Sequence, residues 1–362
     1  MNTKKGSFYK TLLSKVILFA LSFTLNAQDI HFSQFDESPL TLNPAVCGAY
    51  SGQILATVNY RNQWPTISGS NYGYNTMAAS FQLHNVMKKW IKGYLSPGIS
   101  FFSDKTANAN LQTTNVDLTI ASGIYLNPSS SLSGGLQAGW GQQSINLQNI
   151  EWGEQVINGQ YDPHAPSGEP STGNSFSYLD FSAGIYYHYT QGQTTMTKNN
   201  QFKLNLGAAV FHVNEPQLSY YGQSTPGSDL YMRFVLHGNV FYLINNTNFG
   251  IVPSFMFMQQ GPAQEFDIGS KLRYALRSQH KYTGEQGAAI YLGAYYRWND
   301  AIVALLGLEL GSYAIGLSYD LNTSSLINAT TGLGGFEISL RFLNPNPFLS
   351  GQDGMRNNNI PY

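Results

Sequence analysis

Apolar and polar residues alternate strictly over much of this chain. In residues 311–321 (GSYAIGLSYDL), the large side chains of Tyr313, Ile315, Leu317 and Tyr319 alternate with small or polar ones. Successive side chains of a strand leave opposite faces of its sheet. Such a strand meets an apolar environment on one face and a polar one on the other. The pattern therefore predicts an all-β fold, a transmembrane antiparallel β-barrel.

Fourteen segments with this alternation, bounded by clusters of Gly, Pro, Asn and Ser, are expected to be strands. Most have the ~9–11 residues that cross a bilayer at a tilt, and bacterial single-chain barrels have even strand numbers. Merging or splitting one hairpin would give 12 or 16 strands. The expected strands are 53–61, 73–83, 96–104, 111–125, 131–143, 176–189, 201–213, 230–244, 248–258, 264–274, 288–298, 301–309, 312–320 and 335–343.

The lengths of the connections indicate which end of the barrel faces outward. If the first strand begins and the last ends in the periplasm, the odd-numbered connections are extracellular and should be the long ones. The connections at about 144–175, 214–229 and 321–334 follow this rule. Two basic even-numbered connections, 84–95 and 275–287, depart from it. They are expected either to be solvated turns or to contact periplasmic machinery.

The first 27 residues have the pattern of a secretory signal peptide. Four lysines precede a short apolar core, Val16 to Leu25, and Ala27 supplies a small residue before a predicted cleavage at Gln28. Ten apolar residues fall short of the ~20 that a spanning helix needs. The expected organisation is a signal peptide (1–27), an N-terminal segment (28–52), an outer-membrane β-barrel (53–343) and a C-terminal tail (344–362).

Composition supports the same interpretation. Only 11% of the residues are charged, against about 25% in soluble domains, while 14% are aromatic and the mean hydropathy is −0.21. A helical membrane protein would be far more apolar. Removing the predicted signal peptide leaves a net negative charge without a basic patch, so no nucleic-acid partner is expected. The single cysteine, Cys47, is expected to be a small buried residue.

Six charged residues lie on the polar faces of the expected strands and are predicted to face the lumen. Charges are costly in lipid, and the presence of both signs favours a salt-bridged or plugged lumen over a strongly ion-selective pore. A barrel of 14 strands encloses more space than its own side chains fill. Residues 28–52 have no sustained period, which is compatible with a plug, with packing below the barrel or with a leader loop. The six residues are Lys203, Asp267, Lys271, Arg273, Glu337 and Arg341.

Motifs of catalytic or cofactor-binding sites are absent from the sequence. It contains no Gly-rich phosphate loop, HExxH helix, GxSxG elbow or CxxC pair, and the seven histidines lack metal-ligand spacing. We therefore predict no catalytic residue, no metal and no cofactor. An outer-membrane enzyme is the least favoured functional class.

The chain also contains a series of specific sequence blocks. The most specific in combination are IHFSQFDESPLTLNPAVCG (30–48) and GLSYDLNTSSL (316–326). The others are NYRNQW (59–64), FHVNEP (211–216), RFVLHG (233–238), MQQGPAQEFDIGSKLRY (258–274), YYRWNDAI (295–302) and GGFEISLRF (334–342). In this order the blocks resemble the PorP/SprF family of outer-membrane proteins from the type IX secretion system of Bacteroidetes.

The resemblance implies a noncatalytic role in protein export across the outer membrane and, in gliding species, delivery of surface adhesins. It implies as partners the outer-membrane lipid, the periplasmic ring and motor components of the system, and secreted cargo with a C-terminal sorting domain. The alternative is an outer-membrane channel for hydrophobic or small solutes, because other 14-stranded barrels take up apolar molecules past an N-terminal plug.

Polar and aromatic residues within these blocks are candidate contacts with a partner or with the N-terminal segment. Arg61 offers a planar fork and Trp64 a large amphipathic surface. Trp64 also fits the interfacial aromatic girdle at a strand end, and Arg61 an inward position. The candidates are Asn43, Pro44, Tyr60, Arg61, Gln63, Trp64, Arg297, Asp300 and Asp320.

Overall fold

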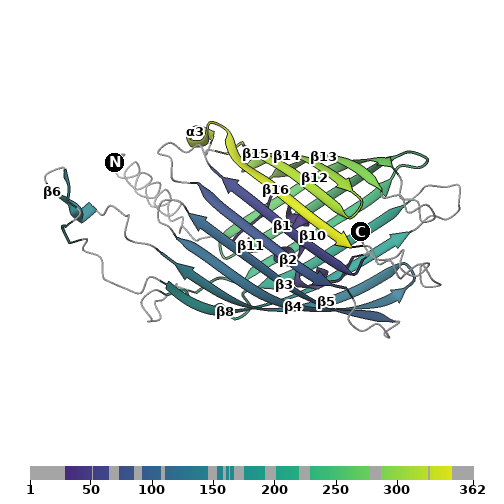
Figure 1. Ribbon diagram of the computed structural model, residues 1–362, viewed down its shortest axis with the longest axis horizontal. Coiled ribbons are helices and arrows are strands. Elements are labelled where there is room, and N and C mark those ends of the chain that lie inside the picture. Colours follow the sequence, from purple (N-terminus) through teal and green to yellow (C-terminus); the bar gives the residue numbers. More distant parts are fainter. Residues whose placement is uncertain are drawn as a thin grey trace, which may run out of the picture.

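The computed structural model describes residues 29–50, 52–64, 73–84, 92–106, 111–145, 153–157, 160–162, 164–166, 175–191, 201–219, 229–277, 287–324 and 327–344. Fourteen of its strands form one closed antiparallel barrel (Figure 1), which confirms the predicted fold and strand number. Each strand pairs with its neighbours along the chain, and β1 closes the barrel against β16. The predicted signal peptide, with its cleavage site at Ala27 and Gln28, and the tail beyond Asn344 lie outside the described residues.

The barrel strands correspond one to one with the expected segments. They are β1 (Ile54–Gln63), β2 (Tyr74–Leu83), β3 (Gly93–Thr106), β4 (Gln112–Asn127), β5 (Ser130–Ser144), β8 (Ser175–Gln191), β9 (Phe202–Phe211), β10 (Arg233–Leu243), β11 (Phe249–Gln260), β12 (Ala263–Arg277), β13 (Ala288–Arg297), β14 (Ala301–Leu310), β15 (Tyr313–Asn322) and β16 (Leu333–Asn344). Alternation failed to predict only the short sheet of β6 (Val156–Ile157) and β7 (Gln160–Tyr161), because strands of two residues have no period to detect.

The two ends of the barrel differ. At one end, here called the turn end, β1 begins, β16 ends and tight turns join β10 to β11 and β14 to β15. The other end, the loop end, carries the long connection between β5 and β8 and the short helix α3 (Ile327–Thr330) (Figure 1). The long connection between β5 and β8 follows the expected parity, whereas short turns join β11 to β12 and β13 to β14 at the same end.

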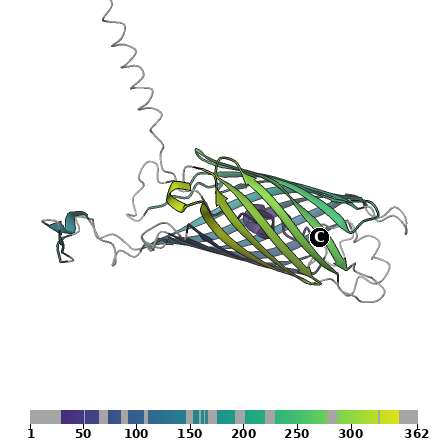
Figure 2. The same cartoon turned by 90° about the horizontal axis from the view of Figure 1, so that it is seen from above.

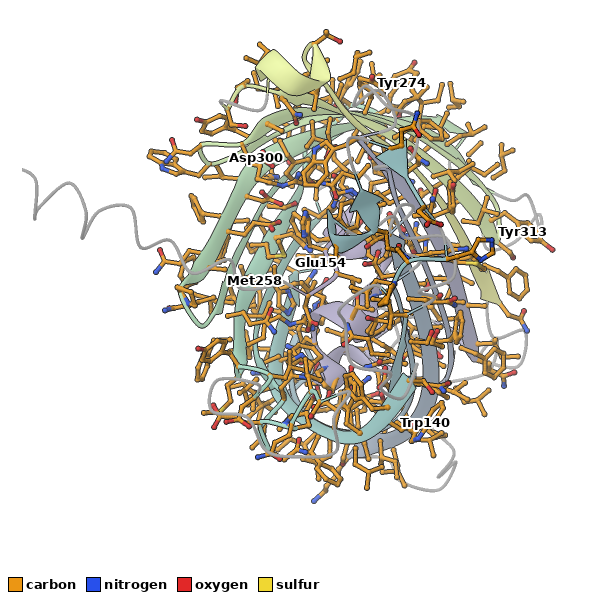
Figure 3. All side chains as sticks on the ribbon, turned by 90° about the vertical axis from the view of Figure 1, so that its left-hand side faces the viewer. Trp140, Glu154, Met258, Tyr274, Asp300 and Tyr313 are labelled. Carbon is orange, nitrogen blue, oxygen red and sulfur yellow. The ribbon has the colours of Figure 1, made fainter. Side chains whose placement is uncertain are left out.

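The outer face of the barrel is apolar. Leu118, Leu136 and Ile185 are more than half exposed at its middle. Aromatic rings pair near both ends, Tyr313 with Phe342 at the turn end and Tyr296 with Trp298 at the loop end, like the girdles of membrane barrels. Figure 3 shows Trp140, Tyr274 and Tyr313 on the outside of the wall. Among the described residues, no helix is long and apolar enough to cross a bilayer.

Residues 29–50, here called the plug segment, lie inside the barrel. They form three short helical turns, η1 (Phe35–Glu37), α2 (Pro39–Leu42) and η2 (Pro44–Val46), which appear in purple within the wall in Figure 2. Most of the segment is buried, including Cys47, which is fully enclosed. Of the three placements compatible with the sequence, the chain therefore adopts the one within the lumen.

Candidate functional site

The plug segment runs lengthwise through the lumen. At the loop end, the backbone N–H of Asp29 donates to Gln260 Oε1 (2.8 Å), and Gln260 is the last residue of β11. At the turn end, the Tyr50 hydroxyl donates to the carbonyl oxygen of Gln82 (2.8 Å), near the end of β2. Figure 3 looks into the loop end and shows the helical turns within the wall. The segment thus contacts the barrel at both rims.

A buried cluster of charges holds the first part of the plug segment. Ser33 Oγ donates to the carboxylate of Asp320 (2.7 Å), and Arg297 Nη2 donates to Ser33 Oγ (2.9 Å). The backbone N–H of Ser33 donates to Glu337 Oε2 (2.7 Å). Arg61 donates from Nη1 to the carbonyl oxygen of His31 (2.6 Å) and from Nη2 to Asp320 (2.8 Å). Four strands, β1, β13, β15 and β16, therefore converge on residues 31–33.

This cluster contains more carboxylates than cations among the described residues. Besides Asp320 and Glu337, Arg297 Nε faces Glu265 at 3.5 Å and Asp267 at 3.4 Å. Two guanidinium groups, those of Arg61 and Arg297, thus serve four buried carboxylates. His31 Nδ1 lies 3.6 Å from Glu265 at the edge of the cluster. Each arginine is therefore essential to the electrostatic balance of the cluster.

The middle of the plug segment combines ion pairs with an apolar contact. Asp36 pairs with Lys271 of β12, and Glu37 pairs with Arg341 of β16 at 3.2 Å. Between them Phe35 packs edge-on against Tyr295, with 5.5 Å between the ring centroids, inside a buried apolar cluster on β9 to β14. The acidic side chains of η1 therefore face basic residues of the wall, and the Phe35 ring faces an apolar patch.

The last part of the plug segment lies against glycines in the wall. Asn43 caps η2, since its Oδ1 accepts from the N–H of Ala45 (2.8 Å), while its Nδ2 donates to the carbonyl oxygen of Ile185 (3.0 Å). A Cβ at Gly184 would lie 2.1 Å from Asn43 Oδ1, and one at Gly135 would lie 2.4 Å from the carbonyl carbon of Pro44. Only glycine allows the segment to approach the wall this closely.

A second set of charges fixes Asp29 at the loop end. Its carboxylate pairs with Arg233 (3.1 Å) and with His212 Nε2, while His212 Nδ1 lies 3.0 Å from Asp180. Burial favours the neutral forms of Asp29 and His212, but the attraction between their opposite charges outweighs this effect. The pKa of Asp29 stays well below its ordinary value despite burial, because His212 and Arg233 are close. Burial alone would lower the pKa of His212, yet Asp29 and Asp180 raise it to about 9.

A polar cavity of about 390 Å³ lies between the plug segment and the turn end. Its charged lining includes Asp36, Lys271 and Glu309, and Glu309 pairs with Arg341 at 2.8 Å. Lys203 also lines the cavity, and within the described part of the chain no carboxylate lies within ion-pair distance of it. The described residues contain no group of three or more acidic, His or Cys side chains arranged to hold a metal ion.

The structure separates the residues that the sequence grouped as candidates. Arg61, Arg297 and Asp320 contact the plug segment, to which Asn43 and Pro44 belong. The six residues predicted to face the lumen all lie on the inner wall. Asp267 and Glu337 belong to the buried cluster of charges around Ser33. Lys271 and Arg341 pair with carboxylates of the plug segment. Lys203 and Arg273 line the cavity.

Tyr60 and Trp64 do not contact the plug segment. Tyr60 is 39% exposed and donates to Asn75, while Trp64 packs edge-on against Tyr74. Arg61 points inward, so its neighbours along the strand must point outward. Gln63 is half-buried at the end of β1, and Asp300 lies at the loop end, 3.4 Å from Arg297.

Several residues of the site were not predicted from the sequence. Arg233 and Glu265 have the inward parity of their strands, a signal that was available. Four others, Ser33, Gln34, Asp36 and Glu37, make contacts across most of the chain length. Asp180 and His212 contact each other across 32 positions, and His212 contacts Asp29 across 183. Local patterns do not indicate such contacts, because strand alternation predicts which face of the sheet a side chain lies on and does not predict which residue it contacts.

Fold and site together define an outer-membrane β-barrel whose lumen is occupied by a segment of its own chain. Residues 24–342 match the family described as type IX secretion system membrane protein PorP/SprF, and the chain belongs to this family. The resemblance seen in the sequence blocks is thereby confirmed. The protein is thus an outer-membrane component involved in type IX secretion, associated with other components of that system.

Solved barrels share the general architecture at low identity. The chain is similar to the CymD monoaromatic hydrocarbon channel (11% identity, 85% of this chain and 92% of that chain, TM-score 0.41). It is also similar to the TodX deltaS2S3 mutant monoaromatic hydrocarbon channel (9%, 84% and 94%, 0.44) and to a Pseudomonas aeruginosa FadL homologue (12%, 83% and 92%, 0.39). Comparison with curated proteins gives no match.

Proposed function

We propose that this protein is a noncatalytic component that supports export or surface anchoring of cargo by docking partners, with its plug segment in place. Family membership supports the secretion role. The occupied lumen supports docking over conduction, because cargo passing through this barrel would first have to displace residues 29–50. In gliding species this cargo would include the surface adhesins.

The energetics of the plug segment support a lumen that stays closed. Removing it would leave Arg61, Arg297, Lys271 and Arg341 without contacts that they make in the closed barrel. Separating one partner of a buried ion pair costs about 3–5 kcal/mol when the other stays buried. Water entering the lumen would offset part of this cost. Several such contacts nevertheless have to break together before the lumen opens.

Docking would then use surfaces outside the lumen. Tyr60, Gln63, Trp64 and Asp300 lie at or near the loop end, where cargo with a C-terminal sorting domain would meet the protein. The turn end would meet the periplasmic ring and motor components. The two basic connections expected to contact this machinery, 84–95 and 275–287, lie largely outside the described residues and stay a prediction.

A channel for hydrophobic or small solutes is the alternative function. It requires the plug segment to move, whereas docking does not. The lone cysteine of the chain makes this difference testable. A Cβ at Gly98 would lie 2.8 Å from Cys47 Sγ, so the substitution Gly98→Cys places two sulfurs within reach of a disulfide between wall and plug.

The test compares export in three strains. A deletion strain should retain cargo inside the cell. The Gly98→Cys strain, with its disulfide verified by gel shift, should export cargo like the wild type if docking is the function. Its matched control is Gly98→Cys combined with Cys47→Ala, which cannot form the bond. Loss of export or of solute uptake in the locked strain alone, restored by reductant, would show that the plug must move.

A further inference from the structure

The direction of the plug segment has a consequence for where the chain preceding it leaves the barrel. The first strand, β1, begins at the turn end, at Ile54. The chain just before it returns through the lumen, so that Asp29 lies at the opposite rim. Strand parity alone predicts an N-terminal segment on the side where β1 begins, and the structure has its first described residue on the other side.

Contacts of the plug segment lead from the loop-end rim to the turn-end rim of the wall. Asp29 meets Gln260 and Arg233 at the loop-end rim, and Ser33 meets Asp320 two residues from the loop end of β15. Further along the segment, Asp36 meets Lys271 in the middle of β12.

The descent continues to the turn end. Ser133, near the turn end of β5, donates to the carbonyl oxygen of Ala45 (2.8 Å). Tyr50 then meets Gln82 at the turn-end rim, and His84 Nδ1 lies 2.6 Å from the carbonyl oxygen of Gly48. Thr41 interrupts this series, because its carbonyl oxygen accepts from Arg233 at the loop end of β10. Asp29 and Tyr50 nevertheless contact opposite rims, which excludes a hairpin that enters and leaves at the same rim.

The exit at the loop end is built from charged groups. Asp29 is held by His212 and Arg233, and His212 is held in turn by Asp180. Arg233 also donates to the carbonyl oxygens of Ile30 (3.4 Å) and Thr41 (3.2 Å). These contacts fix the backbone where it reaches the rim, with side chains from β8, from β10 and from His212 directly after β9.

We propose that the mature N-terminus is displayed at the cell surface: the chain enters its own barrel from outside and passes through the lumen to begin β1 in the periplasm. The loop end is the outer one because the long connections of such barrels are extracellular. An extension or partner attached at the N-terminal side of Asp29 then lies beside the outer loops. This inference concerns topology and does not depend on the proposed docking function.

Labelling of single cysteines on intact cells tests the proposal. Every variant carries Cys47→Ala, which removes the natural thiol. The probe variant has one cysteine inserted directly before Asp29. The controls are Gln217→Cys, exposed at the loop end, and Asn245→Cys, exposed in the turn between β10 and β11. A membrane-impermeant maleimide should label the probe variant on intact cells as strongly as Gln217→Cys, while Asn245→Cys is labelled only after permeabilisation.

The opposite result would overturn the proposal. If the probe variant is labelled only after the outer membrane is permeabilised, like Asn245→Cys, the N-terminal side of Asp29 lies in the periplasm. Should the insertion prevent the barrel from accumulating, Asp29→Cys gives the same readout, since that side chain is partly exposed at the loop end. Export of cargo is measured separately, so a wrong topology and a wrong function are distinguishable.

Discussion

Replacing Arg61 by Met is expected to loosen the plug segment strongly. Arg61 is 2% exposed, and its guanidinium group binds both His31 of the plug and Asp320 of the wall. Met fills a similar volume without charge. The substitution would leave one arginine, Arg297, against four buried carboxylates, and would remove the donor to the His31 carbonyl group.

The magnitude follows from the loss of one partner in a buried ion pair. Such a change costs about 3–5 kcal/mol. Every 1.4 kcal/mol is a factor of ten in an equilibrium, so the population with a released plug should rise roughly a hundredfold to several thousandfold. The closed state should remain the major one if the other plug contacts hold.

Cys47 reports the release directly. The thiol is fully enclosed while the plug is seated, so it should react with maleimide only after the segment leaves the wall. The assay is the rate of Cys47 alkylation in purified barrel in mild detergent. The matched control is Arg273→Met, which removes a lumen-facing arginine that pairs with Glu309 and contacts no plug residue in the described contacts. Equal rates for Arg61→Met, Arg273→Met and wild type would refute the reasoning.

Three further outcomes are expected. Gly135→Ala should speed Cys47 alkylation because its Cβ would overlap the Pro44 backbone, at a cost of about 1–3 kcal/mol. Gly134→Ala should not, because its Cβ would make only an ordinary contact, 3.9 Å from the Gly184 carbonyl oxygen. Phe35→Ala should lower the heat-unfolding midpoint of the barrel through a loss of about 3–5 kcal/mol of packing. The contact of Asp29 with His212 should stabilise the barrel most at intermediate pH, measured as the wild-type midpoint minus that of His212→Gln. The stability contributed by the raised pKa of His212 is complete below the ordinary pKa of histidine and is lost as pH rises through about 9. The stability contributed by the lowered pKa of Asp29 is lost as pH falls below the ordinary pKa of aspartate. A difference independent of pH would contradict the assignment.

The barrel can be predicted from the sequence because alternation is a local property. Each strand shows its own two faces, so residues such as Glu337 and Arg341 reveal an inward position without knowledge of their neighbours. The same logic separates Arg61, which points inward, from Tyr60 and Trp64, which point outward. Of these three candidates, Arg61 contacts the plug segment, while Tyr60 and Trp64 stay predicted contacts with a partner.

The plug contacts are not predictable in this way. Residues 29–50 have no period, and their short helical turns are defined by partners far along the chain. Asn43 caps η2, but its position depends on Gly184 and Ile185 across the lumen. The depth of each plug residue in the barrel, and hence the direction of the segment, follows from the sum of such distant contacts.

The position of the plug segment also constrains the order of assembly. Ser33 binds Glu337 across 304 positions of sequence, and Glu337 belongs to the last strand. The residues translated first in the mature chain therefore reach their final contacts only when the last strand arrives. If β16 paired with β1 before the segment was inside, the chain preceding Asp29 would have to be pulled through a finished ring. Assembly in which the strands curl around the segment, with the seam between β1 and β16 sealed last, avoids this obstacle.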